Sequence, residues 1–186
     1  MCGRYVVFTD TEYKELRDIV DKVERKNREV KTGEIFPTNS APVLFSEHGT
    51  VRADAVVWGF PHFKGSGVII NARSETAAEK RMFAKPLLTR RCIVPAGGFF
   101  EWDKEKNKHL FTRSDTPLYM AGLYNEFGGE KRYVILTRGA NSSMADIHDR
   151  MPVILDRADV REWLNNTEAA MHIMQTASPE LVNRVV

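Results

Sequence analysis

The chain has 186 residues, of which 42% are hydrophobic and 28% charged, a composition that predicts a single soluble domain over residues 1–186. No apolar stretch approaches the ~20 residues of a membrane span, no signal-peptide core is present, and two cysteines favour a reducing compartment over a disulfide scaffold. We therefore expect a cytoplasmic monomer without membrane contact. The net charge of +2 is too balanced to indicate nucleic-acid binding by itself.

Nine short segments have the composition of β-strands. In chain order they are residues 3–8, 42–46, 51–58, 67–71, 91–95, 98–102, 109–113, 118–123 and 132–138. The second and third form a hairpin turned at residues 47–50, where Gly49 relieves the turn. Many short strands against few helices predict an α+β fold with a curved, barrel-like, mainly antiparallel β core and a few packed helices.

Four helices are expected, over residues 11–27, 75–83 and 156–165 and from residue 178 onward. Residues 9–12 form a capping box for the first helix, whose apolar stripe we assign to core packing; the stripe consists of Leu16, Ile19, Val20 and Val23. Asp156 is expected to cap the third helix and to turn Val160, Trp163 and Leu164 inward. Ser178 followed by Pro179 has the form of the fourth N-terminus.

Cys2 directly follows the initiator methionine, and a small second residue normally allows Met1 to be removed. Cys2 would then carry an α-amine and a thiol on adjacent carbons. These groups can attack one aldehyde in turn, the amine giving an imine and the thiol a five-membered thiazolidine ring. An internal cysteine cannot do this. On the dipeptide alone, the simpler alternative is that Cys2 only happens to follow the start codon.

Four separated segments carry a family resemblance. They are residues 2–5 (Cys-Gly-Arg-Tyr), 71–76 (Asn-Ala-Arg-Ser-Glu-Thr), 91–102 and 148–152 (His-Asp-Arg-Met-Pro). In this order and spacing they resemble the SRAP family, the SOS-response-associated peptidases understood as abasic-site processing proteins. Weaker matches lie between the four segments, and the resemblance runs from residue 2 to about residue 155. It implies the SRAP fold and a covalent link, through the N-terminal cysteine, to abasic sites in single-stranded DNA. It also implies a nucleoid location when DNA is bound.

The resemblance assigns catalytic roles to Cys2, Asn71, Glu101 and His148. The Asn71 amide can hydrogen-bond a sugar oxygen or the new ring, with a turn residue as the alternative. Glu101 lies between Phe100 and Trp102, where lost solvation would raise its pKa and suit it to general acid and base catalysis; the alternative is an outward strand position. An imidazole titrates near ~6.5, which suits His148 to proton transfer, although a lone histidine is more often structural.

DNA contacts are expected from Arg4 and Arg73, whose guanidinium groups suit phosphate oxygens. Arg81 and Lys85 belong to a secondary basic stripe, which also contains Lys80, Arg90 and Arg91. Phe36, Trp58 and Phe60 could stack on bases or splay the strand, but core packing is the preferred interpretation for all three. Two departures from the family pattern are Phe100 in place of the usual Tyr and a shortened segment at residues 58–63.

Two rival functions remain open. One is an autopeptidase, a cysteine-type hydrolase in which Cys2 removes Met1 and nothing further happens; the other is a non-catalytic single-stranded DNA-binding module. A lyase activity and contacts with replication or repair proteins are further expectations of the family reading. A zinc site built from Cys2, Cys92 and histidines lacks any C-x-x-C or H-x-x-x-H spacing, so we expect no metal and no cofactor.

Overall fold

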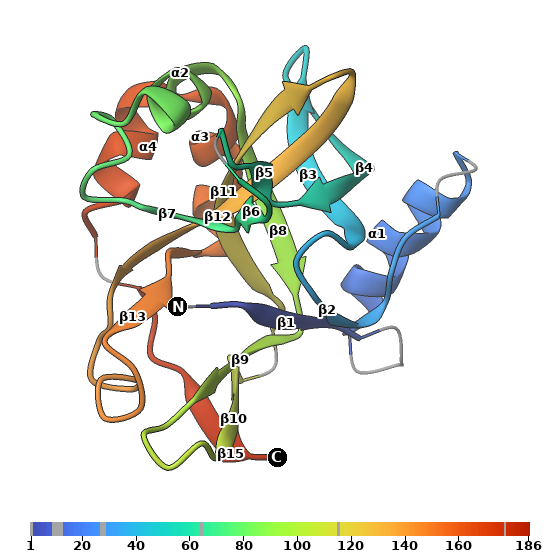
Figure 1. Cartoon of the computed structure of the whole chain (residues 1–186). Coiled ribbons are helices and arrows are strands. Elements are labelled where there is room, and N and C mark those ends of the chain that lie inside the picture. Colours follow the sequence, from blue (N-terminus) through green and yellow to red (C-terminus); the bar gives the residue numbers. More distant parts are fainter. Residues whose placement is uncertain (1, 9–12, 27–28, 64, 115, 177) are drawn as a thin grey trace.

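The centre of the molecule is a closed barrel of five strands (Figure 1). The computed structural model describes residues 2–8, 13–26, 29–63, 65–114, 116–176 and 178–186. The barrel strands follow the order β12-β4-β3-β8-β11, and β11 pairs again with β12 to close the ring. Their bounds are β3 (Ser40–Glu47), β4 (Thr50–Trp58), β8 (Arg91–Ala96), β11 (Leu118–Phe127) and β12 (Glu130–Gly139). The predicted α+β barrel class is confirmed.

A second sheet lies against one end of the barrel and contains the N-terminal strand (Figure 1). Its order is β15-β10-β9-β1-β2, so β1 has a neighbour on each side. Tyr5 lies opposite both Ile35 on β2 and Phe99 on β9. The strands are β1 (Arg4–Val7), β2 (Gly33–Ile35), β9 (Gly98–Trp102), β10 (Lys108–Thr112) and β15 (Val182–Val185).

Short strands extend the barrel at its edges. β7 pairs parallel with β12, β13 pairs antiparallel with β12, and β14 pairs antiparallel with β11, whereas β5 and β6 form a separate ribbon. Their bounds are β5 (Phe60–Pro61), β6 (Val68–Ile69), β7 (Asn71–Arg73), β13 (Arg150–Pro152) and β14 (Ile154–Leu155). The predicted strand at 67–71 is therefore two strands, β6 and β7. The β12–β7 pairing places Asn71 beside Ile135 in the middle of the barrel.

Helices cover the outside of the barrel. α1 (Lys14–Glu24) lies alone on one side, whereas α2 (Arg81–Thr89), α3 (Val160–Asn165) and α4 (Thr167–Ile173) gather on another (Figure 1). The stripe of α1 is buried as predicted, while its predicted capping box lies outside the described residues. No helix of the described segments is long and apolar enough to cross a membrane.

Three helix predictions need correction. The helix expected at 75–83 instead begins at Arg81, after a run of turns. A further helix, α4, was not predicted, although Asn166 caps it by accepting a hydrogen bond from the Ala169 N–H at 3.1 Å. Residues 178–180 have no regular secondary structure and lead into β15, so no helix begins there. Asp156 precedes the short 3-10 helix η2 (Arg157–Asp159) and makes no side-chain cap; its carboxylate pairs with Arg113 at 2.7 Å.

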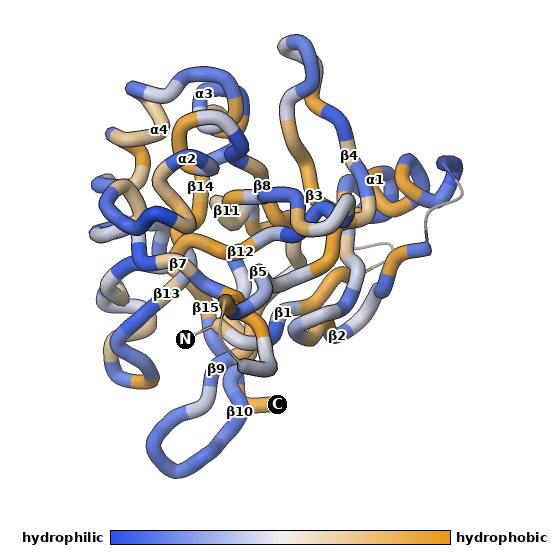
Figure 2. The backbone as a smooth tube through the Cα atoms, turned by 45° about the horizontal axis from the view of Figure 1, so that its top comes forward, coloured by the Kyte–Doolittle hydropathy of each residue, from blue (hydrophilic) through white to orange (hydrophobic). Residues whose placement is uncertain are grey.

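The buried side chains of the barrel strands alternate between two hydrophobic clusters. Val43, Cys92 and Met120 belong to the cluster that includes Cys2, whereas their neighbours Leu44 and Ile93 belong to the cluster under the helices. In Figure 2 the hydrophobic residues follow the central strands, and the loop from β9 to β10 is hydrophilic. The β3–β4 hairpin turns at His48 and Gly49, both at positive φ (50° and 76°), as a two-residue connection requires.

Candidate functional site

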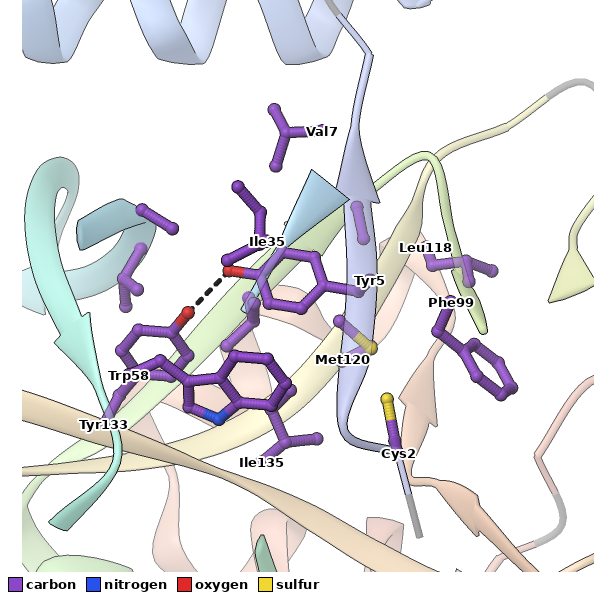
Figure 3. Close-up of a cluster of buried hydrophobic side chains, with 14 of the residues drawn as sticks. Cys2, Tyr5, Val7, Ile35, Trp58, Phe99, Leu118, Met120, Tyr133 and Ile135 are labelled. Carbon is purple, nitrogen blue, oxygen red and sulfur yellow. Dashed lines mark hydrogen bonds between the residues drawn. The ribbon is translucent and has the colours of Figure 1, made fainter. Parts of the chain in front are cut away.

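Cys2 lies inside the first hydrophobic cluster, just before β1 (Figure 3). The residue is 1% exposed, and its Sγ donates a weak hydrogen bond to the Arg4 carbonyl oxygen at 3.8 Å. Burial raises the pKa of the Cys2 thiol far above its usual value, and the negative charge of Glu101 raises it further. The thiol is therefore protonated at neutral pH, so it needs a base when it attacks.

Aromatic residues anchor the strand that carries Cys2. The Tyr5 and Tyr133 hydroxyls share a hydrogen bond of 2.5 Å, which ties β1 to β12 (Figure 3). Trp58 lies between them in the core, edge-on to Tyr5 at 5.2 Å and stacked on Tyr133 at 6.2 Å, and its Nε1–H donates to the Ile70 carbonyl oxygen at 3.1 Å. These contacts fix β1, and with it the position of Cys2.

Asn71 contacts Cys2 directly. Its Nδ2 donates to the Cys2 carbonyl oxygen at 2.9 Å, across the junction of β7 and the N-terminal segment. Asn71 Oδ1 is buried and accepts no hydrogen bond within the described residues. The side chain thus holds the backbone of Cys2 with its donor and keeps an acceptor for another group.

Glu101 is 5% exposed and lies on β9, the neighbour of β1, where Arg4 is opposite Phe100. Its negative charge is one of the causes that raise the pKa of the Cys2 thiol, and the register places Glu101 next to the partner of Arg4, on the side towards Cys2. The strand pairing therefore brings together a thiol and a carboxyl that are 99 positions apart in the sequence. The outward strand position considered for Glu101 is excluded by its burial.

His148 lies in the loop before β13, and Figures 1 and 2 both show β13 beside the segment that precedes β1. Its Nδ1 accepts from the Arg150 backbone N–H at 2.9 Å and lies 3.0 Å from an Asp149 carboxylate oxygen. Met144 and Met151, on either side of this loop, pack in the same hydrophobic cluster as Cys2. The loop thus lies against the core that surrounds Cys2.

An ion pair links the segment after Asn71 to the segment after His148. Arg150 donates to both Glu75 carboxylate oxygens, at 2.6 and 2.9 Å, and to the Thr137 carbonyl oxygen at 2.7 Å. These bonds to Arg150 lower the pKa of Glu75 to about 2. Sequence reasoning missed this contact, although both residues lie in the matched segments, because their spacing of 75 positions gives no sign of it.

Arg4, the first residue of β1 in the second sheet, lies between two aromatic rings. Its guanidinium carbon is 4.3 Å from the centroid of Phe36 and 5.0 Å from that of Trp102, and its Nη1 lies 3.4 Å from a Glu34 oxygen. Lys108 also pairs with Glu34. We call Arg4, Glu34, Phe36, Trp102 and Lys108 the Arg4 cluster. Phe36 is 40% exposed, so this cluster reaches the surface.

The remaining residues expected to contact DNA divide by exposure. Arg73 is exposed on β7, two residues from Asn71. Arg81 and Lys85 are exposed on α2, which Figure 1 shows well apart from β1 and β9, so they lie away from Cys2. Trp58 is fully buried and offers no surface to DNA, and Phe60 is likewise buried, so the packing interpretation holds for both.

Arg91, which was expected to belong to the basic stripe that contacts DNA, is buried. This residue is 6% exposed, and its guanidinium donates to the Trp163, Leu87 and Leu88 carbonyl oxygens at 2.5, 2.7 and 2.9 Å. Arg91 therefore joins α2 and α3 to the barrel and cannot face a phosphate. The described residues hold no group of three or more His, Cys, Asp or Glu side chains arranged for a metal ion.

The fold and site together define an α+β barrel protein with a buried cysteine at position 2, an amide that holds it and a carboxyl beside it. The family model "SOS response associated peptidase (SRAP)" matches residues 1–185. This chain belongs to the SRAP family.

Curated relatives agree with this assignment, and a solved structure shares the fold. The chain is 31% identical to the abasic site processing protein YoaM of Bacillus subtilis, covering 95% of this chain and 84% of YoaM. It is 33% identical to the abasic site processing protein YedK of Escherichia coli, covering 88% and 79% of the two chains. A crystal structure of a Bordetella bronchiseptica protein matches the whole chain and 99% of its own with a TM-score of 0.81 at 23% identity.

Proposed function

We propose that this protein captures abasic sites in single-stranded DNA as a covalent thiazolidine adduct of Cys2, after Met1 has been removed. The observation that carries the proposal is the hydrogen bond from Asn71 Nδ2 to the Cys2 carbonyl oxygen, with the Glu101 carboxyl beside the thiol. Membership in a family whose curated relatives are named abasic site processing proteins supports the same substrate.

The chemistry begins at the α-amine of a mature Cys2. The amine adds to the aldehyde carbon of the ring-opened deoxyribose, and the resulting carbinolamine loses its hydroxyl as water to give an imine. The thiol then adds to the imine carbon and its proton moves to the imine nitrogen, which closes the thiazolidine ring. The net change is aldehyde plus aminothiol giving thiazolidine plus water, so no oxidant or reductant is required.

Glu101 and His148 divide the proton transfers in this proposal. Because the buried Cys2 thiol is protonated, the Glu101 carboxylate accepts its proton during ring closure and passes it to the nitrogen. His148 acts as the acid in its protonated form, in which Nδ1–H faces the Asp149 carboxylate oxygen 3.0 Å away. Its Nε2–H gives its proton to the departing hydroxyl of the carbinolamine, which leaves as water, and the ring is left neutral.

Asn71 Oδ1 and two arginines, the exposed Arg73 and the partly buried Arg4, complete the proposed site. The buried Oδ1 accepts from a sugar hydroxyl or from the ring N–H of the adduct. Arg73 and Arg4 bind phosphates flanking the lesion, and a phosphate that reaches Arg4 replaces its Glu34 contact of 3.4 Å. Phe36, exposed in the Arg4 cluster, provides a face on which a neighbouring base can stack.

The decisive experiment incubates the mature protein with labelled single-stranded DNA that holds one abasic site, followed by denaturing electrophoresis after heating in SDS. Wild type should give a shifted band whose mass equals protein plus DNA minus one water. Cys2→Ala, and a variant that retains an uncleaved N-terminal tag, should give none. Cys92→Ala is the matched control, because Cys92 is the other buried free cysteine.

The rival functions give different results in this assay. An autopeptidase that only removes Met1 leaves the DNA unshifted, although the mature mass lacks methionine. A non-catalytic binding module retards native DNA but loses it in SDS. A tagged protein that crosslinks at full rate and yield would refute the N-terminal mechanism.

A further inference from the structure

A groove of about 860 Å³ runs between α1 and the η2–α3 segment, over strands β3, β4 and β11. None of the residues proposed for abasic-site capture lines it. Its lining residues are Lys14, Glu15, Asp18, Ile19, Lys22, Leu44, Val51, Ala53, Tyr119, Arg157, Ala158, Val160 and Arg161. The groove is therefore a second concave surface, separate from the Cys2 site.

The floor of the groove is aliphatic. Ile19, Leu44 and Ala53 are 7–8% exposed and belong to the hydrophobic cluster under the helices. Val51 and Val160 pack against the same cluster and are partly exposed. An apolar side chain that entered the groove would bury surface against these residues, and such burial is the main source of affinity for a hydrophobic anchor.

The rim of the groove is predominantly cationic. Lys14 and Lys22 on α1 face Arg157 and Arg161 across the groove, and all four are exposed. Two carboxylates, Glu15 and Asp18, are also part of the lining; Glu15 pairs with Arg157 at 3.3 Å, and Asp18 is one helical turn from both lysines. The lining thus holds four cations against two carboxylates, and the excess comes from Arg157 and Arg161 on the η2–α3 side, which favours an anionic ligand.

Tyr119 supplies a hydroxyl at the bottom of the groove. The residue is 5% exposed, it lines both this groove and a smaller adjoining cavity of about 360 Å³, and its oxygen has no hydrogen-bond partner at bonding distance within the described residues. The nearest acceptor is the Glu15 carboxylate, whose hydrogen-bonding and charge add to burial in raising the pKa of Tyr119. A ligand carboxylate that accepts from this neutral phenol replaces the long Glu15 contact, while Glu15 keeps its pair with Arg157.

We propose that this groove binds an acidic peptide that ends in a hydrophobic residue with a free carboxylate. The terminal side chain packs on the aliphatic floor, the terminal carboxylate accepts from the Tyr119 hydroxyl, and the preceding acidic side chains pair with Lys14, Lys22 and Arg161. Single-stranded DNA fits less well, because sites for it stack bases on exposed aromatic rings, and the one aromatic residue of the lining, Tyr119, is buried.

The test is fluorescence anisotropy with a fluorescein-labelled six-residue peptide, four acidic residues followed by Leu and Phe with a free C-terminus. Wild-type protein should bind it, and the amide-terminated peptide should bind ~3- to 10-fold more weakly. Lys22→Glu with Arg161→Glu should weaken binding of the acidic peptide ~10-fold or more, since both are exposed and their reversal puts like charges opposite the ligand. Lys104→Glu, on the β9–β10 loop, is the matched charge-reversal control and should bind as wild type.

Tyr119→Phe removes only the hydroxyl. It should weaken binding of the peptide with a free carboxylate and leave binding of the amide-terminated peptide unchanged. Three outcomes would overturn the proposal. They are no peptide binding up to about 1 mM, equal binding by the charge-reversal and control variants, or charge-reversal variants that no longer bind undamaged single-stranded DNA but still bind the peptide. The last outcome would assign the groove to nucleic acid. Abasic-site crosslinking by the groove variants serves as the check that they are folded.

Discussion

Replacing Glu75 with Gln should make the stability of the protein less dependent on acidic pH. Arg150, which is 13% exposed, holds the half-exposed Glu75 carboxylate through two hydrogen bonds and lowers its pKa from 4.5 to about 2. At ~1.4 kcal/mol for each tenfold change in proton affinity, this gives a ceiling of about 3.4 kcal/mol. Solvent screening at a half-exposed group reduces the expected contribution to about 1 kcal/mol.

The sign of the pH dependence follows from the lowered pKa. The folded state binds the Glu75 proton less tightly than the unfolded state, so the stabilisation is complete above about pH 5 and is lost as the pH falls from 4.5 towards 2. In urea denaturation, Glu75→Gln should therefore be about 1 kcal/mol less stable than wild type at pH 7, and this difference should fall below half by pH 3.

Glu79→Gln, an exposed glutamate four residues away, is the matched control and should show no difference at either pH. A difference between Glu75→Gln and wild type that stays constant from pH 7 to pH 3, or that is zero at pH 7, would show that the Arg150 contact does not stabilise the folded state as an ion pair.

Three further predictions concern DNA binding, proton transfer and packing. Arg73→Ala should weaken the binding of undamaged single-stranded DNA and reduce the slope of log Kd against log salt concentration by about one. Unchanged affinity across the salt series would show that Arg73 has a structural role only. Glu101→Gln and His148→Ala should slow single-turnover adduct formation by ~10² to 10⁴ with DNA affinity retained; rates equal to wild type would remove both from the mechanism. Arg91→Ala should destabilise the fold by ~2–4 kcal/mol in urea, since it leaves buried carbonyl acceptors without donors, and a neutral result would contradict the structural role given to Arg91.

Local sequence patterns predicted those parts of the fold whose structure is decided by residues close together in the sequence. The hairpin of β3 and β4 follows from the turn at Gly49 between two strand-like segments, and α1 follows from its apolar stripe. The irregular path at Ser178 could not be predicted, because distant residues hold it: Asn141 Nδ2 donates to the Ser178 and Pro179 carbonyl oxygens, both at 3.1 Å. Closure of the barrel depends likewise on long-range pairings, of β8 with β11 and of β4 with β12, that periodicity does not reveal.

The candidate site also has parts that the sequence could predict and parts that it could not. The segments that contain Cys2, Asn71, Glu101 and His148 could be chosen from the sequence by their resemblance to one family, and the structure brings Cys2 into contact with Asn71 and close to Glu101. The Tyr5–Tyr133 hydrogen bond carries no sequence signal, since it joins two aromatic residues 128 positions apart.

The Arg4 cluster contains a tryptophan whose intrinsic fluorescence can report on binding. The chain has three tryptophans, and two of them, Trp58 and Trp163, have no exposed surface. Trp102 is only partly buried and lies beside the Arg4 guanidinium, so its indole emission is the one that a soluble quencher can reach and that an arriving nucleotide would perturb. Intrinsic fluorescence can therefore follow occupancy of this edge of the molecule in real time, without a label, while the two enclosed indoles report on the integrity of the core.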